Sequence, residues 1–141
     1  MAFTDIYRVS GSAMTAQTVR LNTIASNLAN AETAAASEDG VYKARRPVFA
    51  AVYGNDELMN NRAMTGARVQ VMDVVESGNA VQRYEPQNPM ANTDGYVYYP
   101  DVNVVEEMAD MMSASRSFET NVDVLNSVKS MQQSLLRLGE V

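Results

Sequence analysis

Residues 104–138 have the sequence VVEEMADMMSASRSFETNVDVLNSVKSMQQSLLRL, an uninterrupted run without proline or glycine. Pro100 cannot lie inside a helix, and Asn103 followed three residues later by Glu106 resembles a capping box. Gly139 marks the other end. The stretch therefore predicts a long helix, which at about 1.5 Å per residue would extend roughly 50 Å.

The apolar residues of this helix form a stripe that changes phase. Its first part has the alternating spacings of a heptad repeat. The second part follows a different phase, so we expect either a bend or different neighbours along the helix. The first part comprises Met108, Met111, Ser115, Phe118, Val122 and Leu125, and the second comprises Val128, Met131, Leu135 and Leu138.

The N-terminal segment predicts a second helix, from about Asp5 to Asn30. Asn30 could end it, because asparagine tolerates the left-handed conformation of a C-terminal cap. At about 1.5 Å per residue this helix would extend roughly 40 Å. Its heptad seam contains Phe3, Tyr7, Ser10, Met14, Gln17, Leu21, Ile24, Leu28 and Ala31, with Ser10 and Gln17 as polar interruptions.

The two predicted helices are long for the size of the chain. The chain has 141 residues and weighs 15.4 kDa, and a compact domain of this size has a diameter under about 40 Å. The C-terminal helix should therefore project beyond the rest of the molecule. A pair of such helices leaves much of each apolar stripe exposed, and exposed apolar surface of this kind favours contact with partner chains.

Between the helices, residues 32–101 predict a small β-rich insert. Turn residues occur at 38–40, and a polar, Asn-rich loop is expected over 54–66. If the insert is compact, the helices lie antiparallel, with both termini at one end and the insert at the other. The fold class is then α+β, with an antiparallel, coiled-coil-like helix pair as a discontinuous assembly domain over 1–31 and 102–141. The expected strands are Pro47–Tyr53, Arg68–Val75 and Tyr96–Pro100.

Composition excludes several classes of function. Cysteine, histidine and tryptophan are absent, so disulfides, thiolate nucleophiles, zinc ribbons, imidazole bases and His-based metal sites are excluded. The 11 basic and 17 acidic residues give a net charge of -6, which argues against nonspecific nucleic-acid binding. No run of about 18 apolar residues predicts a membrane span, and the N-terminus lacks the pattern of a cleavable secretory signal.

Two groups of residues in the C-terminal helix have alternative interpretations. Glu106, Glu107 and Asp110 could form a metal-binding or acid–base cluster, but a solvated first turn stabilised by the helix dipole is favoured. The small residues at 113–117 could allow a close helix crossing or could form an ordinary surface turn. We therefore predict no active site and no cofactor or metal site.

Two parts of the sequence resemble the flagellar rod and hook protein family. Residues 12–33, SAMTAQTVRLNTIASNLANAET, are similar to its N-terminal signature, whose core is Asn-Leu-Ala-Asn after an Ile-Ala pair. Ser26 stands where the family commonly has a second asparagine. Within the family, the proximal rod proteins are resembled by residues 84–89 (YEPQNP), 95–97 (GYV), 100, 103–105 (NVV), 111–122 (MMSASRSFETNV) and 124–131 (VLNSVKSM).

This resemblance implies a structural subunit of the bacterial flagellar basal body, without catalysis or a cofactor. In the family, terminal helices of neighbouring subunits pack into a hollow tube, which crosses the periplasm and transmits torque from the motor to the hook. Subunits leave through the flagellar type III export apparatus without a cleaved signal peptide. The implied partners are other copies of the chain, other proximal and distal rod proteins, and the hook–basal body complex protein at the rod base.

We expect the assembly interface on the two apolar stripes. Two asparagines at the end of the first helix would set its register, or would simply cap that helix. The alternative function is a soluble helical adaptor that docks one cytosolic partner, and an enzyme would require a pocket with converging tyrosine or carboxylate groups. The expected interface comprises Leu21, Ile24, Asn27, Leu28, Asn30, Met108, Met111, Phe118, Val122 and Leu125.

Overall fold

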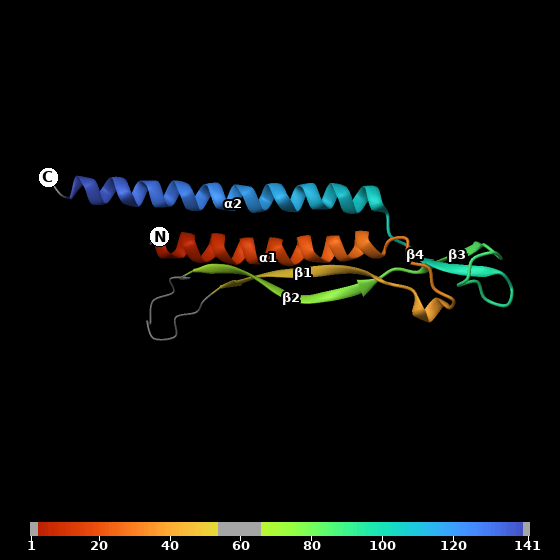
Figure 1. The fold of residues 1–141 in the computed structure, drawn as a ribbon. Helices are drawn as coiled ribbons and strands as arrows, with labels where there is room; N and C mark the ends of the chain where they lie inside the picture. The colour runs from red at the N-terminus through yellow and green to blue at the C-terminus, as the bar shows by residue number, and fades with distance from the viewer. Residues whose placement is uncertain (1–2, 54–65, 140–141) are drawn as a thin grey trace.

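The computed structural model describes residues 3–53 and 66–139. A helix at each end of the chain flanks four strands, which confirms an α+β fold with terminal helices (Figure 1). The predicted Asn-rich loop over 54–66 lies outside the described residues except for Gly66. In chain order, the elements are α1 (Phe3–Asn30), a short 3-10 helix (Glu38–Gly40), β1 (Ala44–Tyr53), β2 (Ala67–Ser77), β3 (Ala80–Tyr84), β4 (Tyr96–Pro100) and α2 (Val104–Leu138).

The start of α2 agrees with the sequence prediction because Asn103 caps it. The Asn103 side-chain oxygen accepts hydrogen bonds from the backbone N–H groups of Val105 (3.1 Å) and Glu106 (3.4 Å). The Glu106 carboxylate lies 3.7 Å from Arg46 on β1, so among the described residues only the asparagine half of the expected capping box forms. At the other end, the N–H of Gly139 is directed to two carbonyls of the last turn.

α1 ends at Asn30, as predicted, but not in the predicted conformation. In the described parts of the chain, no residue other than glycine has a positive φ, so Asn30 is not left-handed. Its side-chain amide donates instead to the carbonyl of Ser26 at 2.8 Å. A local side-chain hydrogen bond, rather than a left-handed backbone, therefore accompanies the end of this helix.

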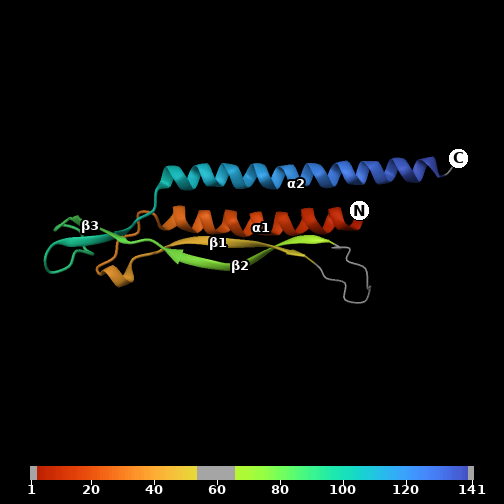
Figure 2. The same cartoon turned by 180° about the vertical axis from the view of Figure 1, so that it is seen from behind.

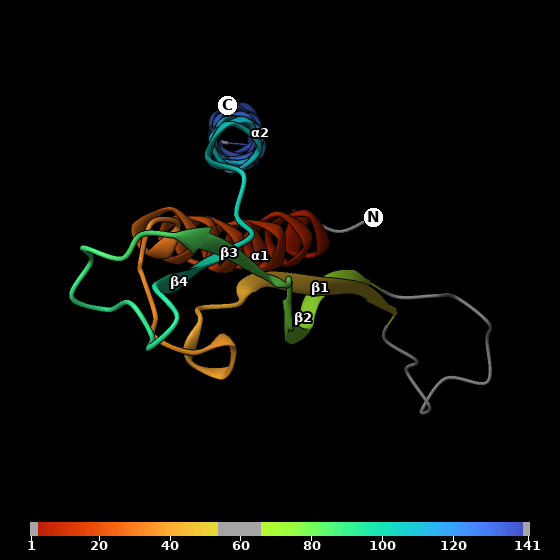
Figure 3. The ribbon, with the colours of Figure 1, turned by 90° about the vertical axis from the view of Figure 1, so that its right-hand side faces the viewer.

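α1 lies between α2 and the hairpin formed by β1 and β2. α2 runs antiparallel beside α1, so the two ends of the chain lie at the same end of the molecule (Figure 1, Figure 2). Viewed along the helices, α2, α1 and the hairpin form three successive layers (Figure 3). We expected the whole insert at the end opposite the termini. This is right for β3 and β4 but wrong for the β1–β2 hairpin, whose alternating half-buried side chains pack back along α1.

The strands form two separate antiparallel sheets of two strands each. In the hairpin, Ala44 of β1 is opposite Ser77 of β2, and the register is irregular between Val48 and Phe49. β3 was not among the strands expected from the sequence. Its five residues form a strand because they pair with the aromatic strand β4, and such pairing leaves little trace in a local pattern.

The second sheet is held where α1 ends and α2 begins. Ala35, which follows α1, exchanges two backbone hydrogen bonds with Tyr98 of β4, of 2.8 and 3.0 Å. Val97 beside it is fully buried. These contacts keep β3 and β4 at the end of the molecule away from the termini.

The core is thin and consists mainly of small side chains. Such residues let neighbouring elements approach closely, but they remove little apolar surface from water. The largest fully buried side chains in the described chain are Val97 and Asn27. The buried apolar residues are Ala16, Ile24, Ala31, Ala35, Val41, Ala44, Val97, Ala114 and Val128.

α2 extends past α1 at the end that carries the termini (Figure 1). It has 35 residues against 28 in α1, and the difference corresponds to roughly 10 Å at about 1.5 Å per residue. Residues 133–139 are all exposed. The expectation that α2 projects beyond the rest of the molecule at this end is confirmed. α1 does not project in this way, and the hairpin covers one of its sides.

Candidate assembly surfaces

One side of α2 follows an unbroken heptad pattern along α1. We expected the apolar stripe of α2 to change phase, so that the helix bends or its parts face different neighbours. Different parts of that stripe do have different surroundings: Met111, Phe118 and Leu125 are half-buried, whereas Met131, Leu135 and Leu138 are exposed. The heptad pattern of covered positions also includes three polar residues, which a pattern of apolar residues does not contain: Glu107, Asn121 and Gln132. The positions of the pattern, all buried or half-buried, are 107, 111, 114, 118, 121, 125, 128 and 132.

The ten expected interface residues fall into three groups by exposure. Ile24 and Asn27 are buried within the chain, at 4% and 1% exposed. Met108 is 55% exposed and lies outside the heptad pattern. The remaining seven are half-buried: Leu21, Leu28, Asn30, Met111, Phe118, Val122 and Leu125.

Asn27 is the centre of a hydrogen-bond network that joins three elements. Its amide nitrogen donates to the carbonyl of Arg45 (2.9 Å) and to Glu107 Oε2 (3.1 Å). Its oxygen accepts from the N–H of Arg45 and from the hydroxyl of Tyr42, both at 2.9 Å. Both of its N–H donors and both acceptor positions are therefore used. Asn30, by contrast, bonds to its own helix, so the two asparagines play different roles.

The acidic residues at the start of α2 join it to other elements. Glu107 is 5% exposed and accepts the hydrogen bond from Asn27, so the favoured interpretation of a solvated turn was wrong for this residue. Asp110 lies 3.1 Å from Arg20 of α1. A pattern of neighbouring acidic residues cannot predict partners that are about 80 or more positions away. Within the described ranges, no group of three or more side chains could hold a metal ion.

In the middle of α2, a small side chain occupies a fully buried position. Ala114 is fully buried, while the adjacent Ser113 is exposed. This favours the close-crossing interpretation of the small residues at 113–117. Nearer the termini, the hydroxyl of Tyr7 donates to Gln132 Oε1 at 3.1 Å, which adds a polar contact at the other end of the helix pair.

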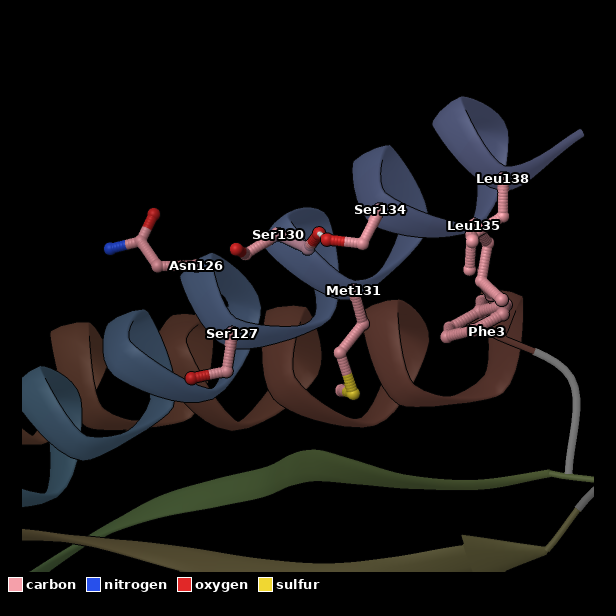
Figure 4. A pocket seen from close by; sticks show the side chains of 8 residues that line it. All are labelled: Phe3, Asn126, Ser127, Ser130, Met131, Ser134, Leu135 and Leu138. Atoms are coloured by element: carbon pink, nitrogen blue, oxygen red, sulfur yellow. Dashed lines mark hydrogen bonds between the residues drawn. The ribbon is translucent and has the colours of Figure 1, made fainter. Parts of the chain in front are cut away.

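The remaining sides of α2 carry large apolar side chains that stay exposed. Near the C-terminal end, α2 and the first residue of α1 border an open groove of about 740 Å³. Figure 4 shows Phe3 of α1 beside Leu135 and Leu138 at one end of this groove. The most exposed apolar residues of α2 are Val105 (74%), Met108 (55%), Met112 (60%), Met131 (51%), Leu135 (54%), Leu136 (72%) and Leu138 (74%).

A second hydrogen-bonded cluster orders the turn between β3 and β4. The side-chain amide of Asn88 and the hydroxyl of Tyr99 both donate to Glu85 Oε2 at 3.0 Å. These two bonds lower the pKa of the Glu85 carboxyl, and the same bond to Glu85 raises the pKa of the Tyr99 phenol. The guanidinium of Arg83 lies 4.9 Å from the centre of the Tyr99 ring. The YEPQNP segment thus builds a compact turn rather than an active site.

Comparison with known proteins identifies the family. Residues 8–36 match the family described as "Flagella basal body rod protein", and residues 93–138 match "Flagellar basal body rod FlgEFG protein C-terminal". The flagellar basal-body rod protein FlgC of Escherichia coli O6:H1 is 46% identical over 141 residues, which cover 99% of this chain and 100% of the relative. The chain belongs to the FlgC family. FlgC of Salmonella typhimurium is 44% identical with the same coverage, and FlgC of Borreliella burgdorferi is 35% identical over 92% of this chain and 93% of the relative.

Membership of the FlgC family confirms the resemblance seen in the sequence. The first matched region contains most of α1 and the residues that follow it, and the second contains β4 and all of α2. The chain is a structural component of the flagellar basal-body rod. Because FlgC proteins are structural rod proteins, the prediction that the chain is not an enzyme is also confirmed. Over residues 3–53 and 66–139, no helix combines the length and apolar character that crossing a membrane requires.

Proposed function

We propose that this chain is a subunit of the proximal part of the rod and assembles by helix packing into a hollow tube. The tube transmits torque from the motor to the hook, because twisting it deforms many buried contacts at once. Its central channel lets exported subunits pass. Membership of the FlgC family and the terminal position of both helices support this proposal.

The exposed apolar surface of α2 carries the proposal. One side of α2 already packs on α1, yet large side chains on its other sides remain in solvent, such as Val105, Met112 and Leu138. Apolar surface distributed along a 35-residue helix suits contact with further helices better than binding of a small ligand. The neighbouring copies and rod proteins would cover it.

The proposed assembly domain consists of residues 1–31 and 102–141, and residues 32–101 form the β-rich insert. The unbroken heptad pattern supports coiled-coil-like packing of the helices. Exposed and half-buried members of the expected interface contact neighbouring helices in this arrangement. Ile24 and Asn27 are buried, so they stabilise the subunit itself and do not contact its neighbours.

The proposed partners follow from this role. They are other copies of the chain, other proximal and distal rod proteins, the hook–basal body complex protein at the rod base, and the flagellar export apparatus. The subunit reaches its place in the periplasmic part of the rod through that apparatus, without a cleaved signal peptide. Nucleic acid is not a proposed partner, since the chain carries a net charge of -6.

Replacement of one exposed apolar residue tests this proposal. Met112→Asp places a charge on the exposed surface of α2 without touching a buried group. We expect cells with this variant to lose swimming and to lack the subunit in purified basal bodies, while the protein keeps its circular dichroism spectrum. Gln133→Glu adds the same charge at an exposed polar position of the same helix, and we expect it to preserve swimming.

Two results would contradict the proposal. One is normal swimming of Met112→Asp cells with the variant present in their rods. The other is failure of a tagged wild-type chain to co-purify with basal bodies, together with its recovery in a discrete cytosolic complex, which the adaptor alternative predicts.

A further inference from the structure

Glu107 is the one carboxylate among the eight heptad positions of α2, and it is 5% exposed. Within the described chain, its side chain receives a direct hydrogen bond from Asn27 at 3.1 Å. The nearby guanidinium groups pair with other carboxylates, Arg20 with Asp110 and Arg46 with Glu106. Because a carboxylate removed from water is costly without its donor, docking of α2 depends on Asn27 meeting Glu107.

Asn27 can offer that donor in one direction only. Its oxygen is held by the N–H of Arg45 and the hydroxyl of Tyr42, and its other N–H is held by the carbonyl of Arg45. The backbone of β1 therefore fixes the orientation of the amide. The remaining N–H points to the place that Glu107 occupies.

The large apolar side chains of the heptad pattern distinguish poorly between registers by themselves. Met111, Phe118 and Leu125 follow one another at intervals of seven residues. A slide of α2 by seven residues thus replaces Met111 by Phe118 and Phe118 by Leu125, one large apolar side chain by another. It also brings Asn121 to the position of the fully buried Ala114, which opposes the slide in the same direction as Glu107 does. The same slide replaces Glu107 by Ala114, which leaves the N–H of Asn27 without an acceptor.

We infer that Glu107 is a positioning residue that selects the register of α2 on α1 through the fixed N–H of Asn27. The ion pair between the two helices is less selective. The pair of Arg20 and Asp110 is partly exposed, with side chains 27% and 42% accessible, and a long arginine can follow a displaced partner. The inference concerns the single subunit, so it stands or falls independently of how subunits assemble.

Distance measurements between the two helices test this inference. The chain has no cysteine, so Ala25→Cys and Lys129→Cys create unique sites for nitroxide labels at exposed positions of α1 and α2. Pulsed electron paramagnetic resonance should show one narrow distance in the otherwise wild-type chain. Glu107→Leu should add a second distance, displaced by up to about 10 Å for a slide of seven residues.

Three further variants separate register from stability. Glu107→Gln should keep the single distance, because its amide oxygen can still accept from Asn27. Asp110→Asn, a matched control one turn along α2, should also keep it. Asn27→Asp should produce the second distance, because it removes the donor and places a second carboxylate beside Glu107.

Several outcomes would overturn the inference. A single unchanged distance in both Glu107→Leu and Asn27→Asp would show that the register does not depend on this pair. Broad distributions in both variants, without a displaced peak, would show that the pair supports docking but does not select a register. A broad distribution in the otherwise wild-type chain would show that the contact does not hold α2 in the free subunit.

Discussion

Asn27 shows how one side chain can connect three layers of a small molecule. It lies on α1, bonds both backbone groups of Arg45 on β1, and donates to Glu107 on α2. In a core built largely from alanine and valine, dispersion and apolar burial are weak sources of geometric specificity. A fully satisfied buried amide supplies that specificity, because each of its partners has a required direction.

Removal of this amide should destabilise the subunit. Asn27→Ala leaves both backbone groups of Arg45 and the buried Glu107 carboxylate without their partner. We expect the free energy of unfolding to fall by on the order of 3 kcal/mol in urea titrations. Asn30→Ala removes one bond within the half-buried end of α1 and should cost less than about 1 kcal/mol. Equal losses for the two variants would contradict this prediction.

Ala114 should be equally intolerant of a larger side chain. It is fully buried, so Ala114→Leu should force α2 away from its neighbours and cost about 1–3 kcal/mol. Ala109→Leu makes the same change at an exposed position of the same helix and should leave stability nearly unchanged. Thermal unfolding followed by circular dichroism measures both. A melting temperature for Ala114→Leu equal to that of Ala109→Leu would argue against close packing here.

The helices and strands differ in how much of their formation is local. α2 has the predicted bounds, since a capping asparagine, a run without proline or glycine and a terminal glycine all lie within or beside it. β3 depends on its partner β4, and its sequence AVQRY carries little signal of its own. The β1–β2 hairpin was expected as strands, but its position along α1 depends on a packing partner outside its own sequence.

The turn between β3 and β4 should depend on pH. The pKa of Glu85 is lowered from its ordinary value of 4.5 by the bonds from Asn88 and Tyr99. The stabilisation from these bonds is therefore present above that value and is lost as the pH falls through the lowered pKa. Nuclear magnetic resonance shifts of the Asn88 side-chain amide and the Tyr99 ring should follow this transition.

The Tyr99 phenol titrates in the opposite sense. Its pKa is raised from 10.0 mainly by the bond to Glu85, so its contribution is present below that value and is lost as the pH rises through the raised pKa. The turn should therefore be most stable between the two transitions. Glu85→Gln should abolish the acidic transition, and its persistence in that variant would assign it to another group.

At the level of the whole molecule, most of the uncovered helix surface belongs to α2 rather than to α1. α1 is covered by α2 on one side and by the hairpin on the other, whereas α2 has one covered side and several exposed ones (Figure 3). Its last turns extend beyond α1 with Leu136 and Leu138 more than 70% exposed. These exposed residues stabilise the free subunit little, so we expect them to act in contacts with other chains.

Truncation separates these two roles. A chain that ends at Gln132 lacks the exposed end of α2, including Leu135 and Leu138 beside Phe3, but keeps the bond with Tyr7 and the buried positions of α2 before it. We expect its melting temperature to fall by no more than a few degrees, while the cells lose swimming. A large loss of stability would show that the end of α2 belongs to the core of the subunit, and normal swimming would show that assembly does not need it.

The sequence by itself determined the two long helices, most of the strands, the absence of histidine and cysteine chemistry, and the family. These features depend on neighbouring residues or on signatures that remain contiguous in the chain. Tertiary structure alone decided that Glu107 is buried against Asn27, that the stripe of α2 runs unbroken through polar positions, and that the β1–β2 hairpin covers α1. The physical reason is that a polar residue in a heptad position satisfies its hydrogen bonds with groups far away in the chain, and a local pattern of apolar residues carries no record of those partners.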